Sequence, residues 1–218
     1  MTPTEFHQAE GLRDWRVLGD GAGAFFASPS LARSARFVQA VAEIDGVDDH
    51  PPAIDIRPGG VTVRLVTLTD EFMGMTARDV EFARRMSAIA NELGMASDPS
   101  RVQHLLIVPG APDVEAIKPF WRAVLGYEPR PDSPDDDLVD PQDRSPGFWF
   151  EPMDQPRADG GGAIHVAVWV APEEAEARVA AAVAAGGHIV RDDYAPSWWT
   201  LADAFGNEAD VATTTGRD

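Results

Sequence analysis

The first hundred residues show regular spacing of apolar side chains in three segments. Residues 29–44 carry apolar side chains every three or four positions, which predicts a helix with Ser28 as its N-cap. Residues 61–67 alternate between apolar and polar, as a half-buried strand does. Thr76–Asp79 has the form of a capping box ahead of a second apolar helical stripe. This order predicts an antiparallel sheet covered by two helices.

The second half of the chain reads as one pattern used twice. The expected elements are a strand at 102–108, a helix at 114–125 and a strand at 147–152, then a strand at 164–170, a helix at 173–185 and strands at 198–201 and 208–213. Each copy looks like a βαβββ unit, with His104 and His165 at equivalent positions 61 residues apart. Such units pair because neither closes a core alone. We therefore expect an α+β protein whose paired βαβββ units form a curled mixed sheet with a cavity.

A helix that stops at Gly94 and a linker at Asp98-Pro99-Ser100 divide the chain. The expected domains are residues 1–97 and 101–218, with separate cores and an exposed linker. The acidic, proline-broken segment 132–143 is expected to be a solvated loop within the second domain.

Net charge and composition limit the classes of molecule that this protein is expected to bind. The formal net charge of −18 disfavours nucleic acid and anionic membrane surfaces as partners. The chain has no cysteine, which excludes disulfides, thiolate metal sites and cysteine nucleophiles. We find no signal-peptide pattern and no apolar stretch long enough to cross a bilayer, and we expect a soluble, cytoplasmic protein. The expected partner is a small-molecule ligand or substrate, and homo-oligomerisation stays open.

Four polar residues coincide when the two copies are superimposed. His104 and His165 lie near the start of the first strand of each copy, and Glu151 and Asp210 lie in the last, 47 and 45 residues later. Alternation places each of the four opposite the fully apolar strand face, on the side that would line a cavity. Two imidazoles and two carboxylates suit a divalent ion such as Zn, Ni, Co, Mn or Fe. The alternative is structural, because a histidine in a core strand is often satisfied locally and a carboxylate can cap a turn.

This half resembles the vicinal oxygen chelate superfamily, the glyoxalase and bleomycin-resistance-like proteins. The resemblance rests on Val102-Gln-His-Leu-Leu-Ile-Val108, Phe120-Trp-Arg-Ala-Val-Leu-Gly-Tyr127, Ile164-His-Val-Ala-Val-Trp-Val170 and Leu201-Ala-Asp-Ala-Phe-Gly-Asn-Glu-Ala-Asp210. It implies that His104, Glu151 and His165 stand at ligand positions of metal-using members, while Asp210 stands where many keep Glu. It also implies that Glu151 or Asp210 acts as a base on a metal-bound substrate. The superfamily includes lyases, isomerases, dioxygenases and metal-free binding proteins, so it implies no single reaction.

The first half resembles pterin-4a-carbinolamine dehydratase. The resemblance rests on Phe37-Val-Gln-Ala-Val-Ala-Glu43, Asp48-Asp-His-Pro51, Val61-Thr-Val-Arg-Leu-Val-Thr67 and Gly74-Met-Thr-Ala-Arg-Asp79. The family's His-His-Pro triplet reads Asp49-His50-Pro51 here, Leu68 holds the place of a later histidine, and Asp79 fits the family's acidic residue. Dehydration needs a base and an acid, roles that His50 and Asp49 can take and Leu68 cannot. The resemblance therefore implies a degenerate site.

Three classes of function remain open. The first is a metal-dependent lyase, isomerase or dioxygenase acting in the second domain, with an unidentified divalent metal. The second is a 4a-hydroxytetrahydrobiopterin dehydratase acting from the first domain through His50, Asp49 and Asp79. The third is a non-catalytic ligand-binding or oligomerising protein.

Overall fold

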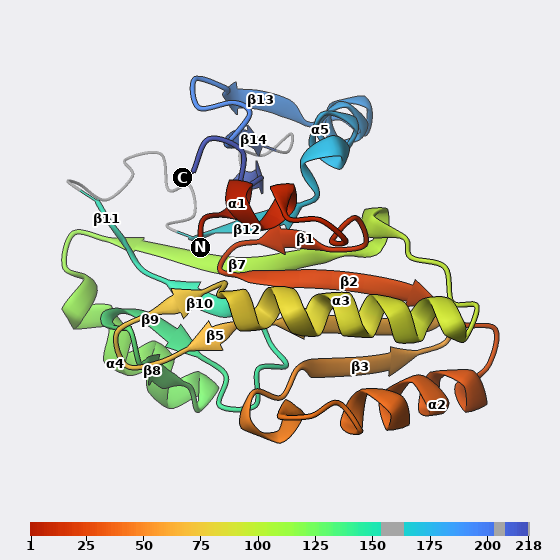
Figure 1. Cartoon of the computed structure of the whole chain (residues 1–218). Helices are drawn as coiled ribbons and strands as arrows, with labels where there is room; N and C mark the ends of the chain where they lie inside the picture. The colour runs from red at the N-terminus through yellow and green to blue at the C-terminus, as the bar shows by residue number, and fades with distance from the viewer. Residues whose placement is uncertain (154–163, 203–207, 218) are drawn as a thin grey trace. The chain divides into compact units, whose positions relative to one another are not determined.

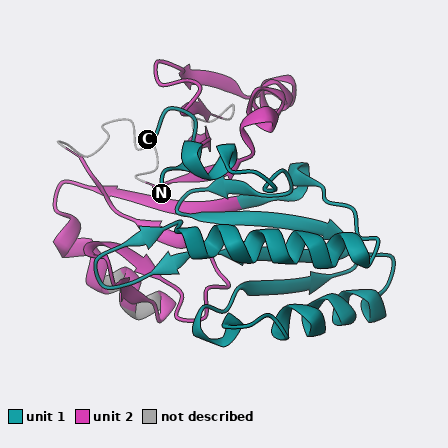
Figure 2. Cartoon of the chain, viewed as in Figure 1, with its two compact units in different colours: residues 1–103, 214–218 teal, residues 104–213 magenta. Residues whose placement is uncertain are grey.

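The computed structural model describes residues 1–153, 164–202 and 208–217 (Figure 1). The chain forms two compact units: unit 1 comprises residues 1–103 and 214–218, and unit 2 comprises residues 104–213 (Figure 2). Within the described residues, each cluster of buried apolar side chains draws on one unit alone. None of the described helices is long and apolar enough to span a bilayer.

Unit 1 contains a four-stranded antiparallel sheet in the order β1-β2-β4-β3. Its elements are α1 (Pro3–Gln8), β1 (Arg16–Leu18), β2 (Gly21–Ala27), α2 (Leu31–Ala42), η1 (Val47–Asp49), β3 (Ala53–Arg57), β4 (Gly60–Leu65), β5 (Thr67–Leu68), β6 (Met73–Gly74), α3 (Ala77–Glu92) and η2 (Pro99–Arg101). Helix α2 begins two residues later than predicted, with Ser30 rather than Ser28 as N-cap. Both α2 and α3 pack on the sheet, which confirms the predicted architecture of this half.

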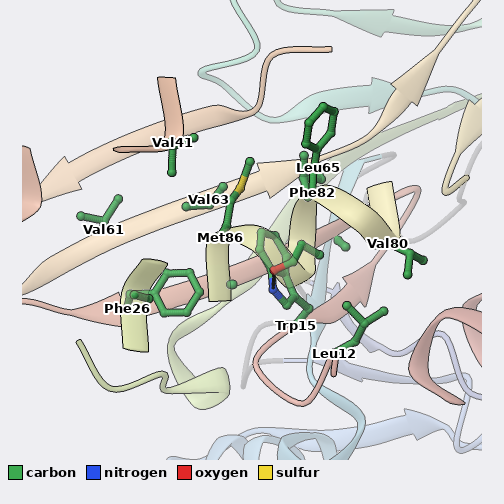
Figure 3. Close-up of a cluster of buried hydrophobic side chains, with 14 of the residues drawn as sticks. Leu12, Trp15, Phe26, Val41, Val61, Val63, Leu65, Val80, Phe82 and Met86 are labelled. Carbon is green, nitrogen blue, oxygen red and sulfur yellow. Dashed lines mark hydrogen bonds between the residues drawn. The ribbon is translucent and has the colours of Figure 1, made fainter. Parts of the chain in front are cut away.

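Alternation along the strands builds the core of unit 1. Val61, Val63 and Leu65 of β4 point to one side, and each is at most 1% exposed. Trp15 lies among these strands and α3, and its indole N–H donates a hydrogen bond of 3.1 Å to the Ala83 carbonyl oxygen (Figure 3). A buried indole needs such a partner, so this bond ties the segment before β1 to α3.

Unit 2 consists of two copies of the predicted βαβββ pattern, except that the expected strand at 147–152 is divided into two short strands in the first copy. The first copy comprises β7 (Gln103–Ala111), α4 (Val114–Leu125), β8 (Glu128–Arg130), β9 (Ser133–Val139), β10 (Gly147–Trp149) and β11 (Glu151–Pro152). The second comprises β12 (Ile164–Val170), η3 (Pro172–Glu174), α5 (Ala175–Ala184), β13 (His188–Arg191), β14 (Trp198–Ala202) and β15 (Glu208–Ala212). One mixed sheet joins them in the order β13-β14-β15-β12-β7-β10-β9-β8, and β11 also pairs with β7.

The apolar strand faces of unit 2 pack against its helices, as alternation predicts. Val168 and Val170 of β12 lie in one cluster with Val179 of α5. Ile107 of β7 and Phe148 of β10 lie in a second cluster that includes side chains of α4. The opposite strand faces are therefore the ones that carry the polar candidate residues.

The acidic segment 132–143 is not simply a solvated loop, and that prediction is wrong. Residues 133–139 form β9, which pairs with β8 and β10. Asp137 is only 6% exposed, with its carboxylate 3.4 Å from the Arg130 guanidinium. Arg130 also pairs with Asp132 at 2.8 Å. These ion pairs compensate the burial of acidic side chains within the sheet.

The predicted linker is partly held against unit 1. The Asp98 amide donates to the Phe25 carbonyl oxygen at 3.0 Å, and the Ala27 amide donates to the Ala96 carbonyl oxygen at 2.8 Å. Asp98 and Pro99 are half-buried, and Ser100 is exposed. The chain after α3 therefore runs alongside β2, and the expectation of a fully exposed linker is wrong.

The separate cores lead to a prediction about local stability. Phe37 in α2 is fully buried, so Phe37→Ala is expected to lower the free energy of unfolding of unit 1 by about 3–5 kcal/mol. Hydrogen exchange followed by mass spectrometry should show faster exchange in β4 and unchanged exchange in β12. Leu31→Ala is the control, because Leu31 begins the same helix but is 72% exposed and should change stability by less than about 0.5 kcal/mol. Equal acceleration in both strands would contradict separate cores.

Candidate functional site

The first candidate site is built around the carboxylate of Asp79, which is fully buried at the start of α3. Thr76 forms the predicted capping box with it: the Thr76 amide and hydroxyl each donate to Asp79 Oδ2 at 2.8 Å. The Thr67 hydroxyl of β5 donates to the same oxygen at 2.7 Å. The carboxylate therefore joins the first turn of α3 to the β5–β6 hairpin.

His50 occupies the other oxygen of this carboxylate. Its Nε2 lies 2.7 Å from Asp79 Oδ1, and its side chain is 13% exposed. The imidazole stacks on Phe82 with ring centroids 5.7 Å apart and an interplanar angle of 15°. The Arg78 guanidinium lies 5.5 Å from the centroid of the Phe82 ring. Both the position and the plane of the imidazole are thus held by neighbours.

The structure brings together two of the three residues that sequence assigns to this site. Asp49, the last residue of η1, is exposed. Among the described residues, its side chain makes no hydrogen bond to the side chain of His50 or Asp79. Leu68 follows Thr67 on β5 and is 43% exposed. The role of Asp49 in proton transfer stays a prediction, and the organised part of the site is the His50–Asp79 pair.

Sequence reasoning missed two neighbours of the pair. Phe82 lies three residues after Asp79, so it shares a helix face with it, and that spacing was the available signal. Thr67 directly precedes Leu68, and alternation on β5 places its side chain on the opposite side, toward Asp79. Phe82 lies outside the segments that carry the resemblance to the dehydratase, and Thr67 ends one of them without having been given a role.

The second candidate site lies in unit 2, where β12 and β15 run parallel. Ala167 pairs with Asp210, so Asp210 is a diagonal neighbour of His165 on the same face. His165 Nε2 lies 3.3 Å from Asp210 Oδ2, and the Thr200 hydroxyl donates to Asp210 Oδ1 at 2.7 Å. The two side chains are 21% and 17% exposed. The structure therefore forms one half of the predicted four-residue constellation.

Nearby carboxylates favour the charged form of His165. Its hydrogen bond with Asp210 is the main reason that its pKa is raised above 6.5, and the negative charges of Asp210, Glu151 and Glu208 act in the same direction. Burial opposes them by disfavouring the imidazolium. Glu151 thus influences His165 through its charge.

The structure does not bring Glu151 to His104. In the first copy, Gly147 pairs with Leu106 and Glu151 pairs with Gly110. Glu151 therefore lies level with a residue six positions after His104, about 20 Å farther along the strand. Asp210, in contrast, pairs with the residue two positions after His165, so Gly147 holds the equivalent level in the first copy.

A metal would need more donors than this arrangement gathers. Across the described ranges, no three His, Asp or Glu side chains are placed so that they could hold one ion. His165 and Asp210 alone do not make a fit for a divalent metal, so we derive no reaction step through one. Metal binding at His104, Glu151, His165 and Asp210 stays a prediction.

The His165–Asp210 contact leads to a prediction about pH. Asp210→Asn removes the nearest negative charge and should lower the pKa of His165, measured by NMR titration of the imidazole in the presence of a chelator. Glu151→Gln is the matched control, because it removes a charge without removing the hydrogen bond and should produce a smaller decrease.

The raised pKa of His165 also determines how the stability of the fold changes with pH. The native state holds the His165 proton more tightly than the unfolded chain, so this stabilisation is fully present below about pH 6.5 and is lost as the pH rises through the native pKa. Asp210→Asn should therefore flatten the fall in stability over this range. An unchanged pKa in Asp210→Asn would contradict the contact.

Comparisons with known proteins divide the chain in the same way. Residues 106–212 match the family of the glyoxalase-like domain, and residues 1–89 match the family of pterin 4 alpha carbinolamine dehydratase. A solved glyoxalase/bleomycin resistance protein/dioxygenase superfamily member from Vibrio splendidus 12B01 is 16% identical, with a TM-score of 0.34 and coverage of 51% of this chain and 99% of its own. No curated protein matches the chain. The chain therefore joins a pterin-dehydratase-like domain to a glyoxalase-like domain, which confirms the fusion that the sequence predicts.

Proposed function

We propose that this protein is a small-molecule enzyme in which unit 1 dehydrates a carbinolamine of the 4a-hydroxytetrahydrobiopterin class. The observation that carries the proposal is the 2.7 Å hydrogen bond between His50 Nε2 and the buried carboxylate of Asp79. The match of residues 1–89 to the pterin dehydratase family supports the substrate class.

The donors around Asp79 set the tautomer of His50. Thr67 and Thr76 supply three donors to Asp79 Oδ2, which is the arrangement of an ionised, acceptor-only group whose Oδ1 can only accept from His50. In the neutral imidazole, Nε2 then carries the hydrogen and Nδ1 keeps its lone pair. No described residue hydrogen-bonds to Nδ1. This nitrogen is the base that the site offers to a substrate.

Dehydration of a carbinolamine needs one proton removed and one delivered. His50 Nδ1 takes the ring N–H proton, the electron pair of that bond forms a C=N double bond, and the adjacent C–O bond breaks. The leaving oxygen takes a proton and departs as water, so the imidazolium can return the proton that it took. The negative charge of Asp79 stabilises the imidazolium between these two transfers. One histidine thus has both duties, because Leu68 cannot supply a second proton-transfer group.

A single histidine implies a slow enzyme whose rate depends on His50. We expect weak wild-type consumption of a 4a-carbinolamine above the uncatalysed rate, and loss of that excess in His50→Gln. Leu68→His combined with Asp49→His should raise the rate. The increase should be at most about 10²–10⁴-fold, which is what a general acid or base typically contributes. His188→Gln is the matched control, because His188 is exposed on β13 of unit 2 and the rate should not change.

A wild-type rate equal to that of a family member with all its histidines would show that Leu68 does not limit the site, which would contradict the expectation of a slow enzyme but not the dehydratase proposal. Two results would contradict the proposal itself. A wild-type rate that His50→Gln leaves unchanged, or no rate in either the wild type or the double variant, would show that unit 1 is not a dehydratase and would favour a binding role.

A second candidate function belongs to unit 2 and is supported by the contact between His165 and Asp210 at 3.3 Å. It is the metal-dependent lyase, isomerase or dioxygenase chemistry that the glyoxalase resemblance implies. The described donors do not fit a metal as they stand. The first question for this proposal is therefore whether unit 2 binds a divalent metal, and the reaction comes second.

Metal content tests this candidate directly. Protein purified without chelators is expected to retain about one divalent ion per chain if the second site is a metal centre. His165→Ala should then lose it while the far-ultraviolet circular dichroism stays unchanged, since the core of β12 lies on its other face. His188→Ala is the control for loss of an unrelated histidine. Absence of bound metal from the wild type after incubation with each candidate ion would contradict a metal-dependent role.

A further inference from the structure

Unit 1 has a cavity of about 390 Å³ that is separate from the His50–Asp79 site. It lies beside the last turns of α3, where Ser87 and Asn91 line it, whereas Asp79 belongs to the first turn. Twelve residues of helix between Asp79 and Asn91 correspond to about 18 Å. The cavity volume falls within the range of about 300–1,000 Å³ that is usual for small-molecule sites.

The cavity combines an apolar floor with a few polar side chains. Phe26, Ala90 and Met95 line it, and all three are at most 4% exposed. Asp14 is the acidic residue of the lining, and its side chain is 14% exposed. Such a combination holds the hydrocarbon part of a ligand by burial and orients it through a small number of polar contacts.

One oxygen of Asp14 is already engaged, and the other is available. The Ser97 hydroxyl donates to Asp14 Oδ1 at 2.6 Å. No described residue hydrogen-bonds to Oδ2. A planar amidinium or guanidinium would need both oxygens for a two-bond contact, whereas an ammonium needs only one. The carboxylate thus favours a primary ammonium group as its partner.

Two further oxygens complete a set of acceptors for an ammonium. Ser87 Oγ accepts the indole N–H of Trp15 at 3.0 Å and keeps a second lone pair. Asn91 also lines the cavity, and its side-chain amide supplies the third acceptor in this proposal. An ammonium has three N–H donors, which this lining can match. The net charge of −18 also attracts small cations and repels anions.

We propose that this cavity binds a small primary amine in its ammonium form, with an apolar body that rests on Phe26 and Met95. Arg13 is the group that opposes the ligand. Its Nε lies 3.7 Å from Asp14 Oδ1, but its side chain is 86% exposed, so its charge is largely screened by solvent. Removing Arg13 should therefore strengthen binding only slightly, whereas removing the charge of Asp14 should weaken it markedly.

Benzylamine is the probe, measured by isothermal titration calorimetry with the full chain. Benzyl alcohol is its neutral comparator. We expect saturable binding of benzylamine and at least 10-fold weaker binding of benzyl alcohol, since a hydrogen bond to a charged group contributes about 10- to 100-fold. Asp14→Asn should raise Kd by the same order, about 10-fold or more, and keeps a carbonyl oxygen for Ser97. Arg13→Gln should lower Kd.

Two controls separate the cavity from general charge and from the His50 site. Glu92→Gln makes the same charge change on the exposed side of α3 and should alter Kd by less than about 2-fold. His50→Gln should leave Kd unchanged. Should Asp14→Asn perturb folding, Asn91→Leu tests the same acceptor set and should also weaken binding. Kd above about 10 mM for the wild type, equal binding of benzyl alcohol, or equal effects of Asp14→Asn and Glu92→Gln would overturn the proposal.

Discussion

Burial of the Asp79 carboxylate is the constraint on which the site of unit 1 depends. A carboxylate that is removed from water is stable only when donors replace the lost hydration. Asp79 obtains those donors from three separate segments, namely β5, the residue before α3 and the residue after η1. Each of the three segments therefore contributes at least one hydrogen bond to the same buried group. The position of His50 is therefore a consequence of satisfying a charge in the core.

Unit 2 depends on a different constraint, the pairing of strands. The polar candidate residues of unit 2 lie on strands whose opposite faces pack against α4 and α5. These residues cannot move to the other face of the sheet without disrupting a core. Their level along the sheet is set by the pairing partner. The His165–Asp210 contact exists because β12 and β15 pair with an offset of two residues, and the offset in the first copy places Gly147 rather than Glu151 at that level.

The accuracy of prediction from sequence follows the range of the interactions involved. Helix α4 begins and ends at the predicted residues, Val114 and Leu125, because helix signals are local. Alternation also predicts which face His165 takes. Sequence could not predict the level of Glu151, since register is decided by a strand 41 residues away. The same limit explains β9, where the Arg130–Asp137 ion pair forms between strands and is not visible as a pattern. Thr67 was missed because its partner Asp79 belongs to another element.

Gly147 shows how two copies of a structural unit can carry different side chains at one position without a change of fold. Backbone hydrogen bonds hold β10 beside β7, and they are independent of the side chain at this position. A Cβ atom built on Gly147 would meet only ordinary contacts, with Leu106 at 3.5 Å and the Leu138 carbonyl oxygen at 3.7 Å. The level that carries a carboxylate in one copy is thus free to carry none in the other. A single substitution at this position could therefore add a functional group to the first copy, because the packing that holds the fold lies on the opposite faces of the same strands.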